Sequence, residues 1–210
     1  MELSNKNSNL HYFQAGKGDP LVFLHGFPDC AVNYKDQIEF FSANGFEVFV
    51  PLMPGYHEDD QELDTYQSLK IAEELSTFIN SVTDKPINLF GHDWGGPIVW
   101  TTGLLYQNTI KAVGALSVPY TPIGEKSLIQ LFRELYKVKF FYQFYIQEEG
   151  VAEAEFEADV RKALEITYFS GDGRGMQFMM ENIGNPAYKK TPESKMLENS
   201  PEFDTYPNWL

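Results

Sequence analysis

The stretch INLFGHDWGGPIVW, residues 87–100, decides the fold. An apolar run typical of a buried strand enters a Gly-His-Asp-Trp-Gly-Gly turn, and an apolar run of helical character follows. A loop that only reversed the chain would not need small residues on both sides of one carboxylate. In a strand-to-helix elbow, the residue at the tip has a strained backbone, and small neighbours such as Gly91, Gly95 and Gly96 let strand and helix approach. The pattern predicts Asp93 as an exposed, ionised carboxylate at the helix amino terminus.

The first 120 residues alternate short apolar runs with longer periodic ones. Strands are predicted at 10–16, 19–26, 46–52, 85–91 and 110–119. One helix is expected to start after Asp64 as its cap, with Ile71, Leu75, Phe78, Ile79 and Val82 at helical spacing, and another to follow Trp94 and run to about Tyr106. Strands that alternate with helices imply an α/β fold with a mostly parallel sheet and helices on both faces.

After Tyr120 the pattern becomes helical. The segments 125–147 and 151–169 both have helical spacing, and Phe156, Val160, Leu164 and Tyr168 form one apolar stripe. We therefore expect residues 1–120 to form the α/β core and residues 121–210 a helical cap.

Charge and composition exclude several classes of function. Sixteen Lys and Arg stand against 30 Asp and Glu, so the net charge of −14 argues against nucleic acid and anionic membranes as partners. A single cysteine, Cys30, excludes an internal disulfide and suits a reducing compartment. No basic leader and no run of transmembrane length are present, which favours a cytoplasmic protein. Nothing in the sequence indicates an oligomeric state.

An elbow aspartate indicates a particular chemistry. A serine that attacked a saturated carbon would form an ether, which water does not readily open. A carboxylate forms an ester, and hydrolysis at the ester carbonyl regenerates the enzyme. That second step needs backbone donors for an oxyanion, and the amides of Phe27, in the loop LHGFPD, and Trp94 are placed to supply them.

These two motifs resemble those of the α/β-hydrolase superfamily and, within it, the epoxide hydrolases. The His-Gly-x-Pro loop matches residues 25–28 and the Gly-x-Asp-Trp-Gly-Gly elbow matches residues 91–96. The resemblance implies an α/β-hydrolase fold, a small apolar epoxide and water as substrates, and neither a metal nor a cofactor. His25, Pro28 and Trp94 are expected to contribute to the substrate site.

Two other functions stay open. A haloalkane dehalogenase also uses an elbow aspartate, but its relatives often carry an asparagine donor at the position of Phe27, whose side chain has no donor. This difference favours the epoxide, and halide release would discriminate between the two. A non-catalytic protein that binds an apolar ligand is the third possibility, for which Asp93→Asn would leave binding intact and no covalent adduct would form.

The cap carries the expected proton donor. Residues 141–155, FYQFYIQEEGVAEAE, resemble the lid of soluble epoxide hydrolases, where the first tyrosine of the Tyr-Gln-x-Tyr run activates the epoxide oxygen. The resemblance assigns that role to Tyr142, with Gln143 and Tyr145 as pocket walls. Without the resemblance, such an aromatic cluster is more often helix packing than catalysis.

A base for ester hydrolysis is not evident among the four histidines, His11, His25, His57 and His92. None is placed to reach a water beside Asp93. In the family, the acid and the histidine follow the lid. We therefore expect them, and the last strands of the sheet, to lie beyond Leu210, and the strand at 111–118 to have an unpaired apolar edge.

Overall fold

The computed structural model describes residues 3–4, 8–58, 66–122, 124, 126–168, 173–182, 184–198 and 200. The chain forms two compact units, Met1–Pro122 and Ile123–Leu210. None of the described helices combines the length and the apolar character needed to cross a bilayer.

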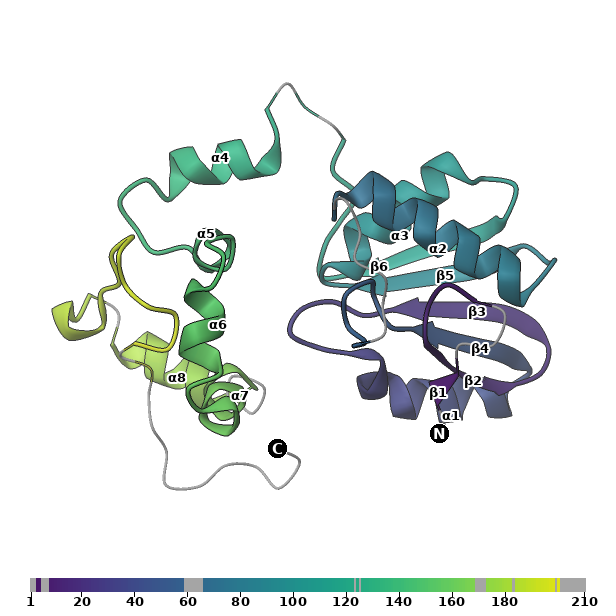
Figure 1. Ribbon diagram of the computed structural model, residues 1–210, viewed down its shortest axis with the longest axis horizontal. Helices are drawn as coiled ribbons and strands as arrows, with labels where there is room; N and C mark the ends of the chain where they lie inside the picture. Colours follow the sequence, from purple (N-terminus) through teal and green to yellow (C-terminus); the bar gives the residue numbers. More distant parts are fainter. Residues whose placement is uncertain are drawn as a thin grey trace. The chain divides into compact units, whose positions relative to one another are not determined.

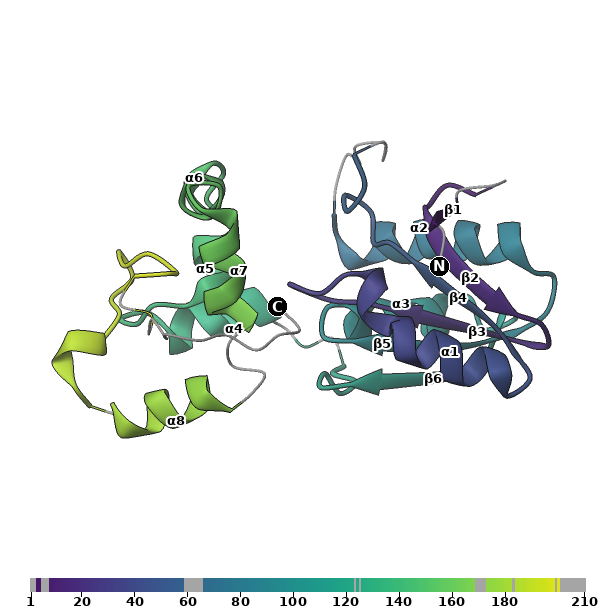
Figure 2. The ribbon, with the colours of Figure 1, turned by 90° about the horizontal axis from the view of Figure 1, so that it is seen from below.

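The first unit is built on a six-stranded sheet within the described residues. Figure 2 shows the strands in their spatial order, which is β1 (Leu3–Ser4), β2 (Tyr12–Gly16), β4 (Phe46–Pro51), β3 (Asp19–Leu24), β5 (Ile87–His92) and β6 (Ile110–Leu116). The pairs β3–β4, β3–β5 and β5–β6 are parallel. The expected, mostly parallel sheet is therefore confirmed, and β6 forms the predicted edge of the described sheet.

The antiparallel part of the sheet is at β2, which is antiparallel to both β1 and β4. Only Lys17 and Gly18 separate β2 from β3. A parallel connection needs a dozen or more residues, so this short turn must reverse the chain. Gly18, with a φ of 138°, makes the reversal possible because L side chains rarely adopt that conformation.

Helices cover both faces of the sheet, as expected. The short helix η1 (Ala31–Tyr34) leads into α1 (Lys35–Ala43) on one face, while α2 (Ser68–Val82) and α3 (Gly95–Leu105) lie on the other (Figure 1). The expected cap of α2, Asp64, lies outside the described residues, and the helix itself begins at Ser68.

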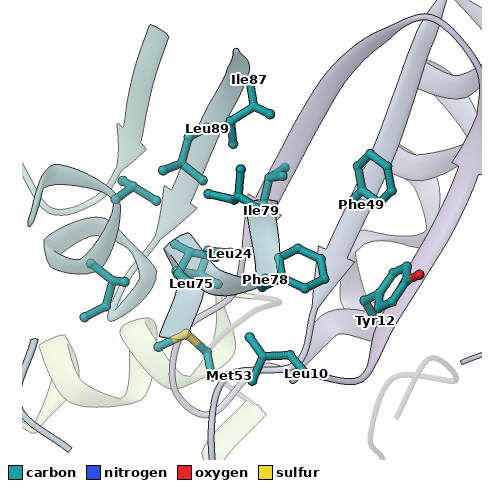
Figure 3. Close-up of a cluster of buried hydrophobic side chains, with 13 residues drawn as sticks. Leu10, Tyr12, Leu24, Phe49, Met53, Leu75, Phe78, Ile79, Ile87 and Leu89 are labelled. Atoms are coloured by element: carbon teal, nitrogen blue, oxygen red, sulfur yellow. The ribbon is translucent and has the colours of Figure 1, made fainter. Parts of the chain in front are cut away.

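Two hydrophobic clusters hold these layers together. Leu75, Phe78 and Ile79 of α2 pack against the sheet with Leu24 and Leu89, as Figure 3 shows. Each such side chain contributes roughly 1.5–3 kcal/mol when fully buried. On the opposite face, Ile38 of α1 belongs to the second cluster, which also contains Leu21, Phe23, Val48 and Val50. Residues 21–24 are all buried because β3 is covered on both faces.

The second unit is helical, as predicted, but its helices are shorter than expected. The structure has α4 (Leu128–Leu135), α5 (Tyr142–Tyr145), α6 (Val151–Phe156), α7 (Val160–Tyr168), α8 (Arg174–Glu181) and the short η3 (Pro186–Tyr188). Each of the two long helices expected from spacing is thus split into two.

The splits have local causes. Phe141 is extended, and its ring stacks on Tyr136 at 4.3 Å and meets Phe132 at 5.0 Å, so aromatic packing folds the chain back between α4 and α5. The carboxylate of Asp159 accepts a hydrogen bond from the amide of Lys162 at 3.0 Å and starts α7 as an N-cap. Two members of the predicted apolar stripe, Val160 and Leu164, are exposed in the structure.

The packing around α3 makes Gly95→Ala a test of the close strand-to-helix approach. A methyl group at Gly95 would lie 2.3 Å from the carbonyl oxygen of Leu24. Because backbone atoms block the methyl, we expect the free energy of unfolding to fall by about 2–3 kcal/mol, measured by urea titration. Gly124→Ala, whose methyl would lie 3.8 Å from the nearest atom, is the matched control. Equal stability of the two variants would contradict the packing argument.

Candidate active site

Asp93 stands at the tip of a strained turn between β5 and α3. Its φ of 52° is left-handed, which costs an L-residue roughly 1–2 kcal/mol. The amide of Gly96 donates to the carbonyl oxygen of Asp93 at 2.8 Å and closes the turn. A methyl group at Gly91 would lie 2.3 Å from the carbonyl oxygen of Gly95, so strand and helix are in direct backbone contact. The strained elbow predicted from the sequence is therefore confirmed, although Asp93 is only partly exposed.

The loop after β3 meets the Asp93 carboxylate. The amide of Phe27 donates to Asp93 Oδ1 at 2.9 Å, and Oδ2 has no hydrogen-bond partner among the described residues. A methyl group at Gly26 would lie 2.6 Å from both Cβ and Oδ1 of Asp93, so only glycine allows this contact. The amide of Trp94, the second donor expected, makes no hydrogen bond to Asp93 within the described part of the chain.

His25 supports this loop from inside the protein and does not present a nitrogen to a ligand. It is fully buried, and its Nε2 accepts a hydrogen bond from the amide of Met53 at 3.0 Å. Nδ1 therefore carries the proton and donates to the carbonyl oxygen of Gly26 at 3.2 Å. Burial lowers the pKa of His25 below 6.5, which agrees with a neutral ring. We expected His25 to contribute to the substrate site, but the structure places it beneath the loop, where it supports the backbone at Gly26 and Met53.

Asp29 connects the same loop to the elbow. Its Oδ1 accepts a hydrogen bond from Asn33 Nδ2 at 2.6 Å, and its Oδ2 lies 3.7 Å from Nδ1 of His92. The ring of His92 is thereby directed toward Asp29 in this loop. Pro28 lies between Phe27 and Asp29 and is half-buried.

Two residues near Asp93 were not singled out by sequence reasoning. The ring of Tyr56 packs edge-on against His25 at 4.5 Å, and its pKa is raised by burial and then by the negative charge of Asp93. Ser117 Oγ accepts a hydrogen bond from the amide of Asp93 at 3.2 Å. One signal could have identified Ser117, because it directly follows β6 and the carboxyl ends of neighbouring parallel strands share one edge of the sheet.

The expected cap residues lie in the second unit. Gln143 Nε2 donates to the hydroxyl oxygen of Tyr142 at 3.2 Å. The hydroxyl of Tyr145 donates to Glu155 at 2.8 Å, and burial together with this carboxylate raises the pKa of Tyr145 to about 12. Glu155 also accepts hydrogen bonds from the amides of Met196 and Leu197. The Tyr145 hydroxyl is therefore part of a hydrogen-bond network that connects α5, α6 and the segment at 196–197. The meeting of Tyr142 with Asp93 stays a prediction.

Comparison with known proteins supports the fold. Residues 19–165 match the family described as alpha/beta hydrolase fold. A solved epoxide hydrolase from an endophytic Streptomyces superposes with a TM-score of 0.84 at 28% identity, covering 100% of this chain and 63% of that chain. The α/β-hydrolase fold expected from the two motifs is thereby confirmed.

Relatives in sequence carry epoxide hydrolase names. The chain is 30% identical over 196 residues to bifunctional epoxide hydrolase 2 of Mus musculus, covering 92% of this chain and 34% of the mouse protein. It is 33% identical over 159 residues to epoxide hydrolase A of Mycobacterium tuberculosis, covering 74% of this chain and 49% of that protein. The chain thus spans between a third and a half of the length of these two relatives.

Acid should destabilise the fold through His25. The folded state holds the pKa of His25 below 6.5, whereas the unfolded chain returns it to about that value, so the unfolded state binds more protons as the pH falls below 6.5. His25→Gln removes this difference, and we expect the unfolding free energy to fall less steeply with acidification, by up to about 1.4 kcal/mol per pH unit. Urea titrations from about pH 7 to about pH 5 measure both slopes. Equal slopes would contradict the assignment.

Proposed function

The chain belongs to the α/β-hydrolase fold family, and on that premise we propose that it opens epoxides by attack of the Asp93 carboxylate, forming an ester. The observation that carries the proposal is the orientation of this carboxylate. Oδ1 accepts the Phe27 amide at 2.9 Å, and Oδ2 has no partner among the described residues. One oxygen is held by the backbone, and the other is free to act as a nucleophile.

The proposed first step balances as a displacement at saturated carbon. Asp93 Oδ2 forms a bond to one epoxide carbon, the ring C–O bond breaks, and the ring oxygen takes the electron pair as an alkoxide. Tyr142 gives its hydroxyl proton to that alkoxide as general acid. Oδ1 becomes the carbonyl oxygen of the ester and keeps its place beside the Phe27 amide.

The second step is hydrolysis of the ester to a diol. Water adds to the ester carbonyl, and the charge that develops on Oδ1 is stabilised by the Phe27 amide, with the Trp94 amide as the second proposed donor. The bond between the carbonyl carbon and Oδ2 then breaks, so the diol leaves with Oδ2 and the water oxygen completes the Asp93 carboxylate. One water proton goes to the departing diol oxygen, and the other restores the Tyr142 hydroxyl. Trp94, Pro28 and Gln143 are the proposed walls of the pocket for a small apolar epoxide. The epoxide hydrolase names of the relatives support this substrate class.

The ester is expected to accumulate in the 210-residue chain. The second step needs a base that takes a proton from the water. Each of the four histidines in the chain has contacts elsewhere than at the Asp93 carboxylate. His11 and His57 stack on each other at 3.5 Å, His25 is buried, and His92 faces Asp29. Many turnovers to diol would show that a base is present within this chain.

Incubation with styrene oxide should add the mass of one epoxide to the intact chain. Asp93→Asn should abolish this adduct, because an amide is a poor nucleophile while asparagine tolerates the left-handed backbone. Asp84→Asn, which removes an exposed carboxylate, should react like the wild type.

Hydroxylamine separates the proposed ester from a side reaction. Cys30 is a free, half-exposed thiol that an epoxide could alkylate to a thioether. Hydroxylamine cleaves an ester and leaves a thioether intact, so the adduct should disappear on treatment. A wild-type chain that forms no hydroxylamine-sensitive adduct would contradict the proposal and favour a non-catalytic binding protein.

Tyr142→Phe should slow adduct formation, because the departing oxygen then lacks a proton donor. We expect the rate to fall about 100-fold or more, which is typical for loss of a general acid. Tyr136→Phe removes a hydroxyl from the same unit and should keep the wild-type rate. Equal rates for the two variants would remove Tyr142 from the mechanism.

A haloalkane is the probe for the second enzymatic possibility. The Phe27 side chain offers a departing halide no hydrogen-bond donor, so 1-bromobutane should react more slowly than styrene oxide. Bromide release faster than formation of the epoxide adduct would favour a dehalogenase.

A further inference from the structure

Ser117 shares an unusual backbone conformation with Asp93. Among the described residues, these two are the non-glycine residues with a positive φ, 52° for Asp93 and 65° for Ser117. They also lie next to each other in space, because β5 and β6 end on the pair His92 and Leu116. Each strand therefore leaves the sheet through a left-handed residue at the same edge.

The Ser117 hydroxyl links the two strand ends. It donates to the carbonyl oxygen of Leu116 at 2.6 Å and accepts from the amide of Asp93 at 3.2 Å. A hydroxyl has one proton, so its use on Leu116 leaves a lone pair facing the Asp93 amide. The same amide lies 3.4 Å from the carbonyl oxygen of Leu116, which is a longer contact.

A serine at this place is not explained by the backbone alone. Glycine adopts a positive φ without steric cost, and asparagine adopts it more readily than most residues. The left-handed turn at Ser117 is therefore strained, and what serine contributes in return is the hydroxyl. Strain of this kind persists only where the surroundings determine the conformation.

Helix α3 supplies those surroundings. Trp100 Nε1 donates to the carbonyl oxygen of Val118 at 3.2 Å. A methyl group at Gly96 would lie 3.1 Å from Cβ of Val118, so the segment after β6 is packed against the first turn of α3. Helix α3, which begins just after Asp93, thus holds the backbone that follows Ser117.

We infer that Ser117 is a positioning residue for the nucleophile, an inference that rests on the proposed function of Asp93. Its hydroxyl fixes the Asp93 amide, so that the carboxylate at the other end of the residue meets the Phe27 amide and turns Oδ2 outward. Without the hydroxyl, the Asp93 amide keeps only the 3.4 Å contact to the carbonyl oxygen of Leu116. The hydrogen bond between the Phe27 amide and the Asp93 carboxylate then breaks more often.

Ser117→Gly tests this inference, since glycine removes the hydroxyl and relieves the strain. Residue-resolved hydrogen exchange should show the Asp93 and Phe27 amides exchanging about tenfold faster, the effect of losing one ordinary hydrogen bond. Formation of the styrene oxide adduct should slow by about the same factor. Thermal unfolding should occur at or above the wild-type temperature, because glycine accepts the positive φ. A merely structural role of Ser117 would not slow the reaction of an equally stable protein.

Two further variants complete the test. Ser117→Ala also lacks the hydroxyl but keeps the strain, so it should show the same faster exchange. Ser81→Ala removes a hydroxyl that donates to Phe78 before β5 begins, and it should leave both amides and the adduct rate unchanged.

The possible outcomes separate the two proposals. Unchanged exchange at Phe27 in both Ser117 variants would overturn the positioning role, whatever the adduct rate. Faster exchange at Phe27, in a protein whose wild type forms no adduct, would support the positioning role and remove the proposed chemistry.

Discussion

The left-handed backbone of Asp93 is the constraint on which the rest of the site depends. At a φ of 52°, the side chain leaves the sheet edge where its carboxylate meets the Phe27 amide in the loop after β3. The absent side chains of Gly26 and Gly95 let that loop and α3 approach, because a methyl group at either would overlap neighbouring atoms at 2.6 Å or less. The contact between Phe27 and Asp93, 66 positions apart in sequence, is a consequence of this close packing.

The constraint is maintained by hydrophobic layers on both sides of the sheet. Leu75, Phe78 and Ile79 hold α2 on one face, and Ile38 holds α1 on the other. Because β3 and β5 are neighbouring parallel strands, the loop that carries Phe27 and the turn that carries Asp93 emerge from the same edge of the sheet. The packing of these layers offsets the cost of the strained turn.

Much of this arrangement could be predicted because its signals are local. The Gly-rich turn around Asp93, the loop that contains Phe27 and the apolar spacing of α2 are each readable in a short segment. Other features depend on contacts between distant residues. The extended backbone at Phe141 follows from aromatic packing with Tyr136, and the bond from Asp93 to Ser117 depends on the pairing of β5 with β6. Neither leaves a pattern in helical or strand spacing, and burial of His25 likewise emerges only in three dimensions.

The most direct test of the central claim is to locate the covalent adduct. The chain would be treated with styrene oxide, digested, and its peptides sequenced by tandem mass spectrometry. We expect the added mass to lie on Asp93. An added mass on Cys30 or on a histidine, with Asp93 unmodified, would contradict the claim that the elbow carboxylate is the nucleophile.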